Sequence, residues 1–297
     1  MSNNTLVSII LNCKNGEKYL NHALSSVLKQ TYKNWELIFF DNFSTDNSKK
    51  ILMSYKDERF KYFLNTSPSN LSVARNRAIN QAKGNIITIL DHDDWWVENK
   101  LQDQVSCFAN NNVDLIFTDF YQYYEGKNII KKINSKIEGS LYYSIINNYN
   151  LGLNTFAFNS NLFKKHKFDE DYHIIGDFSL IVEISKFIKW TKLNKPSCYY
   201  RIHDFSESNS GDLKHIKELK HWYYYKFKNK EKNKDLKKKI INKLNYMKFL
   251  YNIKKNNKEY IINFKKTYFL SNYKAKEVAY IFIFYLKNLI KNFTLKT

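Results

Sequence analysis

Short apolar runs alternate with amphipathic stretches through the first hundred residues of the chain. The runs at residues 6–11, 35–40, 60–64 and 86–90 have the length and composition of buried strands. Between the first two runs, apolar residues recur at helical spacing from Tyr19 to Leu28. A regular order of strand, helix and strand joins parallel strands through right-handed crossovers. The pattern therefore predicts an α/β fold with a mainly parallel sheet flanked by helices.

The alternation loosens beyond Asp119. Residues 121–137 predict a hairpin, and helical spacing returns at residues 180–188 before a predicted loop at residues 200–203. From about residue 212 the pattern predicts several lysine-rich helices with aromatic faces. A helix after the second strand is expected to have Ser44 as its N-cap.

The net charge of +20 is concentrated at the C-terminal end of the chain. Residues 211–297 contain 23 lysines, no arginine and six acids, so +17 of the charge lies there and +3 in residues 1–210. This asymmetry predicts one domain at residues 1–210 and a basic helical region at residues 211–297. A codon bias toward Asn, Lys, Ile, Tyr and Phe is the alternative explanation for much of the lysine excess.

Cysteine spacing and hydropathy narrow the class of protein further. Cys13, Cys107 and Cys198 are odd in number and lack a CxxC spacing, which favours reduced thiols over disulfides or a zinc site. The longest uninterrupted apolar run, residues 279–286, is too short to span a bilayer. The N-terminus leads directly into a predicted strand and does not resemble a signal peptide. We therefore expect a cytoplasmic protein.

Polar segments follow three of the predicted strands, at residues 12–15, 41–42 and 91–94. Ligands of open α/β sheets bind beyond the carboxyl ends of the strands, so these segments are expected to form one site. The carboxylates of Asp91 and Asp93 suit a hard cation, Mg²⁺ or Mn²⁺. The alternative is that these acids cap a helix that begins near Glu98.

Five further residues are candidates for chemistry. Asp177 begins a predicted amphipathic helix, where a carboxylate stays ionised and can accept a proton; its alternative role is an N-cap. Arg75 and His203 are candidate phosphate ligands, with a surface or satisfied polar role as the alternative. Trp95 and Trp96 are a candidate sugar platform, with a place in the core as the alternative.

Together these motifs resemble the family 2 glycosyltransferases, whose fold is GT-A. The resemblance covers about residues 5–208, and its motifs have the family's order and spacing. The segments that carry it are residues 8–15, 19–20, 26–32, 35–48, 74–76 with Gly84, 91–93, 176–180 and 199–208.

The resemblance implies a metal-dependent, inverting transferase. Its donor would be a nucleotide sugar, with UDP as the first expectation, and its acceptor a hydroxyl of a bacterial surface glycan or lipid-linked oligosaccharide. Asp177 would be the general base, and Asp91 and Asp93 would hold Mn²⁺ or Mg²⁺. The implied donor-binding residues are Asn12, Asn15, Asp41, Asn42, Arg75, Asp91 and His203.

Three positions depart from the family's pattern. Asn42 replaces the second acid of a pair, which leaves the identity of the base open. Phe43 replaces a glycine, which predicts a differently shaped turn. Gly176 replaces a glutamate, so Asp177 would act without an acidic neighbour on that side.

Two other functions are alternatives to the transferase. A nucleotide-sugar pyrophosphorylase needs a glycine-rich phosphate loop that residues 12–16 do not provide. A nucleic-acid-binding protein is suggested by the basic region, which however lacks arginine and a recognisable module. A predicted helix at residues 281–293 has one basic side and one aromatic side. It is expected to pack on the body, to contact a second copy, or to lie at the inner face of the plasma membrane.

Overall fold

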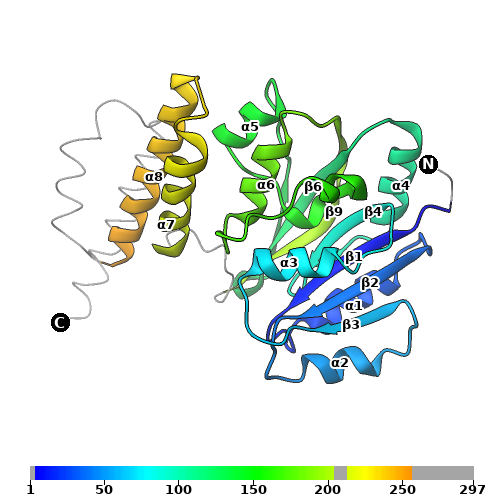
Figure 1. Ribbon diagram of the computed structural model, residues 1–297. Coiled ribbons are helices and arrows are strands. Elements are labelled where there is room, and N and C mark those ends of the chain that lie inside the picture. The colour runs from blue at the N-terminus through cyan, green and yellow to red at the C-terminus, as the bar shows by residue number, and fades with distance from the viewer. Residues whose placement is uncertain (1–3, 204–212, 256–297) are drawn as a thin grey trace, which may run out of the picture. The chain divides into compact units, whose positions relative to one another are not determined.

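Residues 4–203 and 213–255 are the part of the chain that the computed structural model describes (Figure 1). The chain divides into two compact units, one ending at Ser208 and one beginning at Asn209. The first, called here the α/β unit, contains the β-sheet. The second, called the helical unit, contains helices over its described residues.

The sheet of the α/β unit has nine strands over the described residues, in the order β3-β2-β1-β4-β8-β6-β9-β5, and β7 pairs with β6. The strands are β1 (Val7–Cys13), β2 (Trp35–Asp41), β3 (Phe60–Leu64), β4 (Ile86–Asp91), β5 (Trp95–Trp96), β6 (Leu115–Tyr124), β7 (Ile129–Ile133), β8 (Ala157–Asn159) and β9 (Trp190–Ile202). The four strands predicted from apolar runs are confirmed as β1 to β4.

The strand directions change along the sheet. β3, β2, β1 and β4 are parallel to one another, as the crossovers predict. β8 then pairs antiparallel with both β4 and β6, while β6 and β9 are parallel. The α/β prediction is confirmed, and the later half of the sheet is mixed. The predicted hairpin at residues 121–137 is confirmed by the antiparallel pairing of β6 with β7.

The helices flank this sheet in Figure 1. In the α/β unit they are α1 (Leu20–Leu28), α2 (Ser48–Ser54), α3 (Leu71–Ile79), α4 (Lys100–Asn110), α5 (Leu141–Asn147) and α6 (Gly176–Ile184), with 3₁₀ turns η1 (Glu125–Lys127), η2 (Leu153–Thr155) and η3 (Ser160–Lys164). In the helical unit they are α7 (Leu213–Trp222), a π-helical turn (Tyr223–Phe227) and α8 (Lys234–Lys254). The predicted lysine-rich helices are thus confirmed as far as residue 254.

The core of the α/β unit explains why the first strands are apolar throughout. Every residue of β1 and β2 is buried, because helices cover both faces of this part of the sheet. α1 contributes Leu20, Ala23, Leu24 and Val27, each fully buried, to the same hydrophobic cluster as Leu37 and Phe39 of β2. Continuous apolar runs, with no alternation, are therefore the expected signal of these strands.

Three local predictions were wrong. Ser44 does not cap α2, which begins at Ser48, and its hydroxyl instead accepts a hydrogen bond from the Asn15 N–H (3.0 Å). Residues 200–202 are not a loop but the end of β9, paired with β6. The acids at residues 91–94 do not cap α4, whose N-cap position is Asn99 and has no side-chain hydrogen bond.

Within the described residues, no helix combines the length and hydropathy that a bilayer crossing requires. The predicted amphipathic helix at residues 281–293 lies outside the described residues. In the helical unit, Ile216, Leu219 and Trp222 form the buried side of α7.

Candidate active site

The polar segments that follow β1, β2 and β4 meet at one edge of the sheet. Asn12 is in register with Asp91 of β4, and the neighbouring Cys13 is in register with Asp41 of β2. The Asn12 side chain is 5% exposed, and neither its amide nitrogen nor its amide oxygen has a partner among the described residues. Unpaired polar atoms buried at this edge point to a polar ligand, because burial without a partner is costly.

Asn15 and Asp41 tie the loop after β1 to the loop after β2. Asn15 has a positive φ of 53°, and its Oδ1 accepts a hydrogen bond from the Thr45 N–H at 2.8 Å. Asp41 accepts the Ser44 N–H at 2.8 Å and the Tyr62 hydroxyl at 3.0 Å. Both predicted donor-binding residues therefore shape the loops at this edge of the sheet.

Phe43 lies between these contacts with a φ of 67°, the left-handed conformation that favours glycine. The turn therefore keeps a backbone conformation that glycine would favour, despite the phenylalanine, and the differently shaped turn stays a prediction.

Asn42 is buried, and its side chain is already engaged. Its Oδ1 accepts hydrogen bonds from the Asn65 amide (2.9 Å), the Ser69 N–H (3.1 Å) and the Ser69 hydroxyl (3.0 Å). Its Nδ2 donates to the Ser69 carbonyl oxygen at 2.8 Å. Asn42 thus holds the segment at residues 65–69 against β2, and a base that bonded to it would compete with Ser69.

The two predicted metal ligands have different partners. Arg75 is 4% exposed and donates from Nη2 to Asp91 Oδ1 at 3.0 Å, while its Nε has no partner among the described residues. His203 Nε2 lies 3.1 Å from Asp93 Oδ2. Burial alone would raise the pKa of Asp93, but the bond from His203 and the charge of His92 outweigh burial and lower it. Asp93 is therefore held as a carboxylate.

Asp94 points away from this pair and into the protein. It accepts the backbone N–H of Arg201 at 2.8 Å and the Asn154 amide at 2.5 Å. Burial, together with the charges of Asp93 and Asp91, raises its pKa well above the usual range. Asp94 anchors the turn at residues 91–94.

Arg201 holds the same turn in place, a role that no sequence pattern predicts. Its Nε donates to the Asp93 carbonyl oxygen at 2.8 Å, and its guanidinium lies over the rings of Tyr19 (4.6 Å) and Trp95 (4.7 Å). The Trp95 ring is stacked between His22 (4.3 Å) and Tyr199 (4.7 Å). Trp95 thus packs against neighbouring rings and Trp96 is 3% exposed, so the structure supports the alternative in which the pair are packing residues.

Asp177 lies in the first turn of α6, not at its N-cap position, which is Ile175. Its Oδ2 accepts the Tyr149 hydroxyl at 2.9 Å, and its Oδ1 accepts the Phe178 N–H at 2.7 Å. Burial raises the pKa of Asp177, against the lowering effect of the nearby Arg75 charge. The charge of Asp91 also acts on Asp177. The N-cap alternative is wrong, and the fold brings Asp177 near Arg75 and Asp91.

The segment at residues 168–176 sets this arrangement by clamping α3 against the start of α6. Asn76 exchanges two hydrogen bonds with the Phe168 backbone, both 2.9 Å, and Ser72 donates to the Tyr172 carbonyl oxygen at 2.5 Å. A Cβ atom added at Gly176 would overlap Ser72 Oγ. α3 supplies Arg75 and α6 supplies Asp177, so this contact sets the separation of the two charges.

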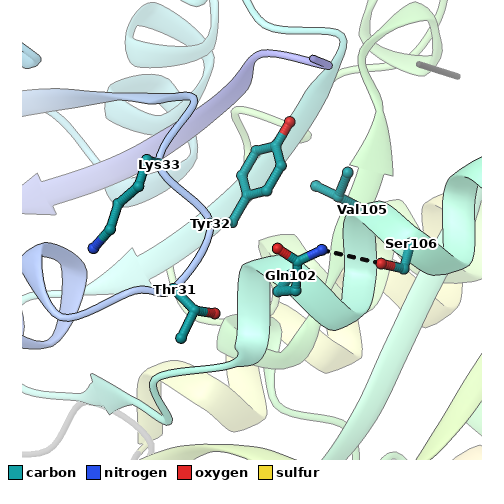
Figure 2. A pocket seen from close by; sticks show the side chains of 6 residues that line it. All are labelled: Thr31, Tyr32, Lys33, Gln102, Val105 and Ser106. Atoms are coloured by element: carbon teal, nitrogen blue, oxygen red, sulfur yellow. Dashed lines mark hydrogen bonds between the residues drawn. The ribbon is translucent and has the colours of Figure 1, made fainter. Parts of the chain in front are cut away.

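A separate cavity of about 330 Å³ lies between α4 and the segment that precedes β2, and Figure 2 shows the side chains that line it. It is lined by Thr31, Tyr32, Lys33, Gln102, Val105 and Ser106. It lies toward the amino end of β2, and none of its lining residues is a predicted site residue.

Asp91 and Asp93 are the described residues that fit a divalent cation at this site. Among residues 4–203 and 213–255, no three His, Cys, Asp or Glu side chains converge as a metal-binding group. Asp91 and Asp93 nevertheless supply the carboxylate oxygens that Mg²⁺ and Mn²⁺ prefer, and they lie at the same edge as the unpaired Asn12. The pair fits a cation whose other ligands come from a bound phosphate.

Solved structures with the same fold place the α/β unit in a structural class. The Staphylococcus aureus TarS 1-349 structure in complex with UDP-GlcNAc matches at a TM-score of 0.53 and 17% identity, covering 81% of this chain and 80% of that chain. The mannosyltransferase PcManGT from Pyrobaculum calidifontis, in complex with GDP-Man and Mn²⁺, matches at 0.56 and 16%, covering 81% and 69%. The chain therefore has the GT-A fold.

Sequence similarity identifies the family. Residues 8–181 match the family described as Glycosyl transferase family 2, and the chain belongs to this family. A relative from Escherichia coli is the UDP-Glc:alpha-D-GlcNAc-diphosphoundecaprenol beta-1,3-glucosyltransferase WfgD. It is 34% identical over 173 residues, which are 57% of this chain and 68% of the relative. The chain is thus a glycosyltransferase.

Proposed function

We propose that this glycosyltransferase moves a sugar, with inversion, from a UDP-sugar to a hydroxyl of a lipid-linked glycan. One observation carries the proposal: the half-buried carboxylate of Asp177 feels the charge of the Arg75 guanidinium, which also holds Asp91. The fold therefore brings a candidate base into electrostatic range of a candidate phosphate ligand that lies 102 positions away in the sequence. The UDP-sugar and the lipid-linked acceptor are supported by the names of WfgD and of the TarS complex.

The donor side of the site is proposed from its unpaired polar atoms. Asn12 would bond the nucleoside portion with its free amide, in a pocket shaped by Asn15, Asp41 and Asn42. Arg75 would donate from its unpaired Nε to a diphosphate oxygen. Each of these contacts gives a buried polar atom the partner that it lacks.

Asp91 and Asp93 would hold Mn²⁺ or Mg²⁺ together with oxygens of the donor diphosphate. A bound cation would neutralise the negative charge that grows on the leaving diphosphate. His203 donates to Asp93 and would keep its carboxylate turned toward this site. The Mn²⁺ in the PcManGT complex supports a cation in this fold.

The chemistry assigned to the protein's own residues is proton removal. The acceptor oxygen would form a bond to the anomeric carbon as the bond from that carbon to the diphosphate oxygen breaks. Asp177 would take the proton from the acceptor hydroxyl, and Arg75 would stabilise the departing phosphate charge. A single displacement of this kind inverts the anomeric configuration.

The substitution Asp177→Asn tests the proposal, because it keeps size and fold and removes the base. We expect transfer to fall on the order of 10²–10⁴-fold while binding of UDP is retained. Glu183→Gln on the same helix is the matched control, since the Glu183 side chain is 57% exposed and bonds His166. Near wild-type transfer by Asp177→Asn, measured with a GlcNAc-diphosphate lipid and a panel of UDP-sugars, would remove Asp177 from the mechanism.

We also propose that the helical unit is a separate region that contacts the membrane where a lipid-linked acceptor resides. Lysines of α8 such as Lys234 and Lys238 are exposed and suit anionic headgroups. Flotation with vesicles of anionic lipid at low salt tests the contact, and a dimer in solution is the competing outcome.

A further inference from the structure

Tyr149 makes a contact with Asp177 that no sequence motif marks. It lies between α5 and η2, and its hydroxyl donates to Asp177 Oδ2 at 2.9 Å. Its ring meets the Phe178 ring edge-on, with centroids 5.5 Å apart. Tyr149 is thus held at its ring by the residue that follows Asp177 and at its hydroxyl by Asp177 itself.

The position before Asp177 cannot provide such support. Gly176 has no side chain, and a Cβ there would overlap Ser72 Oγ. Of the other charged groups that act on Asp177, Asp91 opposes its ionisation, and Arg75 favours it but also bonds Asp91. The Tyr149 hydroxyl is therefore the side-chain donor that the structure gives to this carboxylate.

The state of the tyrosine suits a donor. Burial, followed by the charge of Asp177, raises the pKa of Tyr149 well above its usual range, so the phenol keeps its proton at neutral pH. A carboxylate has about four acceptor sites on its two oxygens, so the bonds from Tyr149 and from the Phe178 N–H leave room for an acceptor hydroxyl. The tyrosine holds Asp177 without blocking it.

We propose that Tyr149 is a positioning residue that fixes the orientation of Asp177 and favours its ionised form. The inference rests on the proposed function of Asp177 as the general base. A hydrogen bond to a carboxylate stabilises its charged form, so loss of that bond raises the pKa of the acid. A base must be ionised to act. Without the Tyr149 hydroxyl, activity should therefore be lost at a higher pH than in the wild type as the pH falls.

Tyr149→Phe keeps the ring and removes the hydroxyl. We expect the acid limb of the pH profile of kcat to move upward by about one pH unit, a tenfold change in the acid's ionisation constant. Above this limb the rate should recover to within a few-fold of wild type. A purely structural role would lower the rate equally at every pH, or not at all. Tyr121→Phe, which removes the hydroxyl of a β6 tyrosine whose ring stacks on Tyr199, is the matched control.

A second variant keeps the inference testable if Tyr149→Phe does not fold. Fluorotyrosine at position 149 keeps the shape, donates more strongly and should move the acid limb downward. An unmoved limb in both variants would overturn the inference while Asp177→Asn still abolishes transfer. If Asp177→Asn keeps near wild-type transfer, the proposed function itself fails, and the two failures are distinguishable.

Discussion

Gly176 lies where α3 packs against α6, and the substitution Gly176→Ala tests this packing by adding one methyl group. Its Cβ would overlap Ser72 Oγ, whereas the next nearest atom, Ser72 Cβ, is at an ordinary 3.5 Å. In Gly176→Ala the Ser72 hydroxyl must therefore rotate away and release the Tyr172 carbonyl oxygen, to which it donates at 2.5 Å. The Ser72 hydroxyl is therefore the group that clashes with the alanine methyl.

The magnitude follows from the contacts that are lost and gained. A buried carbonyl left without its donor costs about 1–3 kcal/mol. A change from glycine to alanine in a compatible helical backbone stabilises by about 0.4–1 kcal/mol through the unfolded chain. Gly176→Ala should thus destabilise the α/β unit by about 1–2 kcal/mol. In a Ser72→Ala background the overlap is absent, and the same change should be neutral or stabilising.

Urea unfolding followed by tryptophan fluorescence measures the four free energies of this double-mutant cycle. Four of the five tryptophans lie in the α/β unit, so the signal reports the relevant transition. We expect a coupling energy of about 1–3 kcal/mol between positions 72 and 176. Equal effects of Gly176→Ala in both backgrounds would refute the argument from the Ser72 hydroxyl.

Three further predictions concern a buried amine, a strained turn and the metal. Burial lowers the pKa of Lys100 to about 7, so between pH 7 and 10 the unfolded chain binds more protons than the folded one. The melting temperature should therefore rise over this range, and Lys100→Met should flatten the rise. Phe43→Gly should raise the unfolding free energy by about 1 kcal/mol by relieving the left-handed backbone, and a loss in urea melts would contradict this. Asp93→Ala should abolish Mn²⁺-dependent transfer with the fold intact, whereas full wild-type activity in excess chelator would reject the cation.

The sequence predicts the first half of the sheet well and the second half poorly, for a physical reason. β1, β2 and β4 are almost entirely buried, so their apolar runs are unambiguous. β9 is half-buried, carries Pro196 and lysines, and is interrupted by register shifts against β6. Its pairing is a long-range property that no local period reveals.

The candidate site also contains residues that the sequence predicts and residues that it does not. Asp91, Asp93 and Asp177 lie in motifs with a recognisable order, so their neighbourhood could be expected. Tyr149 and Arg201 could not, because their contacts cross 28 and about 108 positions of sequence. Asp177 would be the N-cap residue if α6 began at residue 178, but α6 begins at Gly176. Helical periodicity does not resolve a difference of two residues in where a helix begins.

The hold of Arg201 on the turn at residues 91–94 has a consequence for synthesis on the ribosome. β1 to β4 emerge first and can pair in the order in which they are made, since domains fold as the chain is produced. The turn that follows β4 gains its bonds from Arg201 only after another hundred residues have been added. A nascent chain that stops before β9 would have the parallel half of the sheet but lack these restraints on Asp93 and Asp94. Catalytic competence should therefore appear late in translation, well after the first strands are paired.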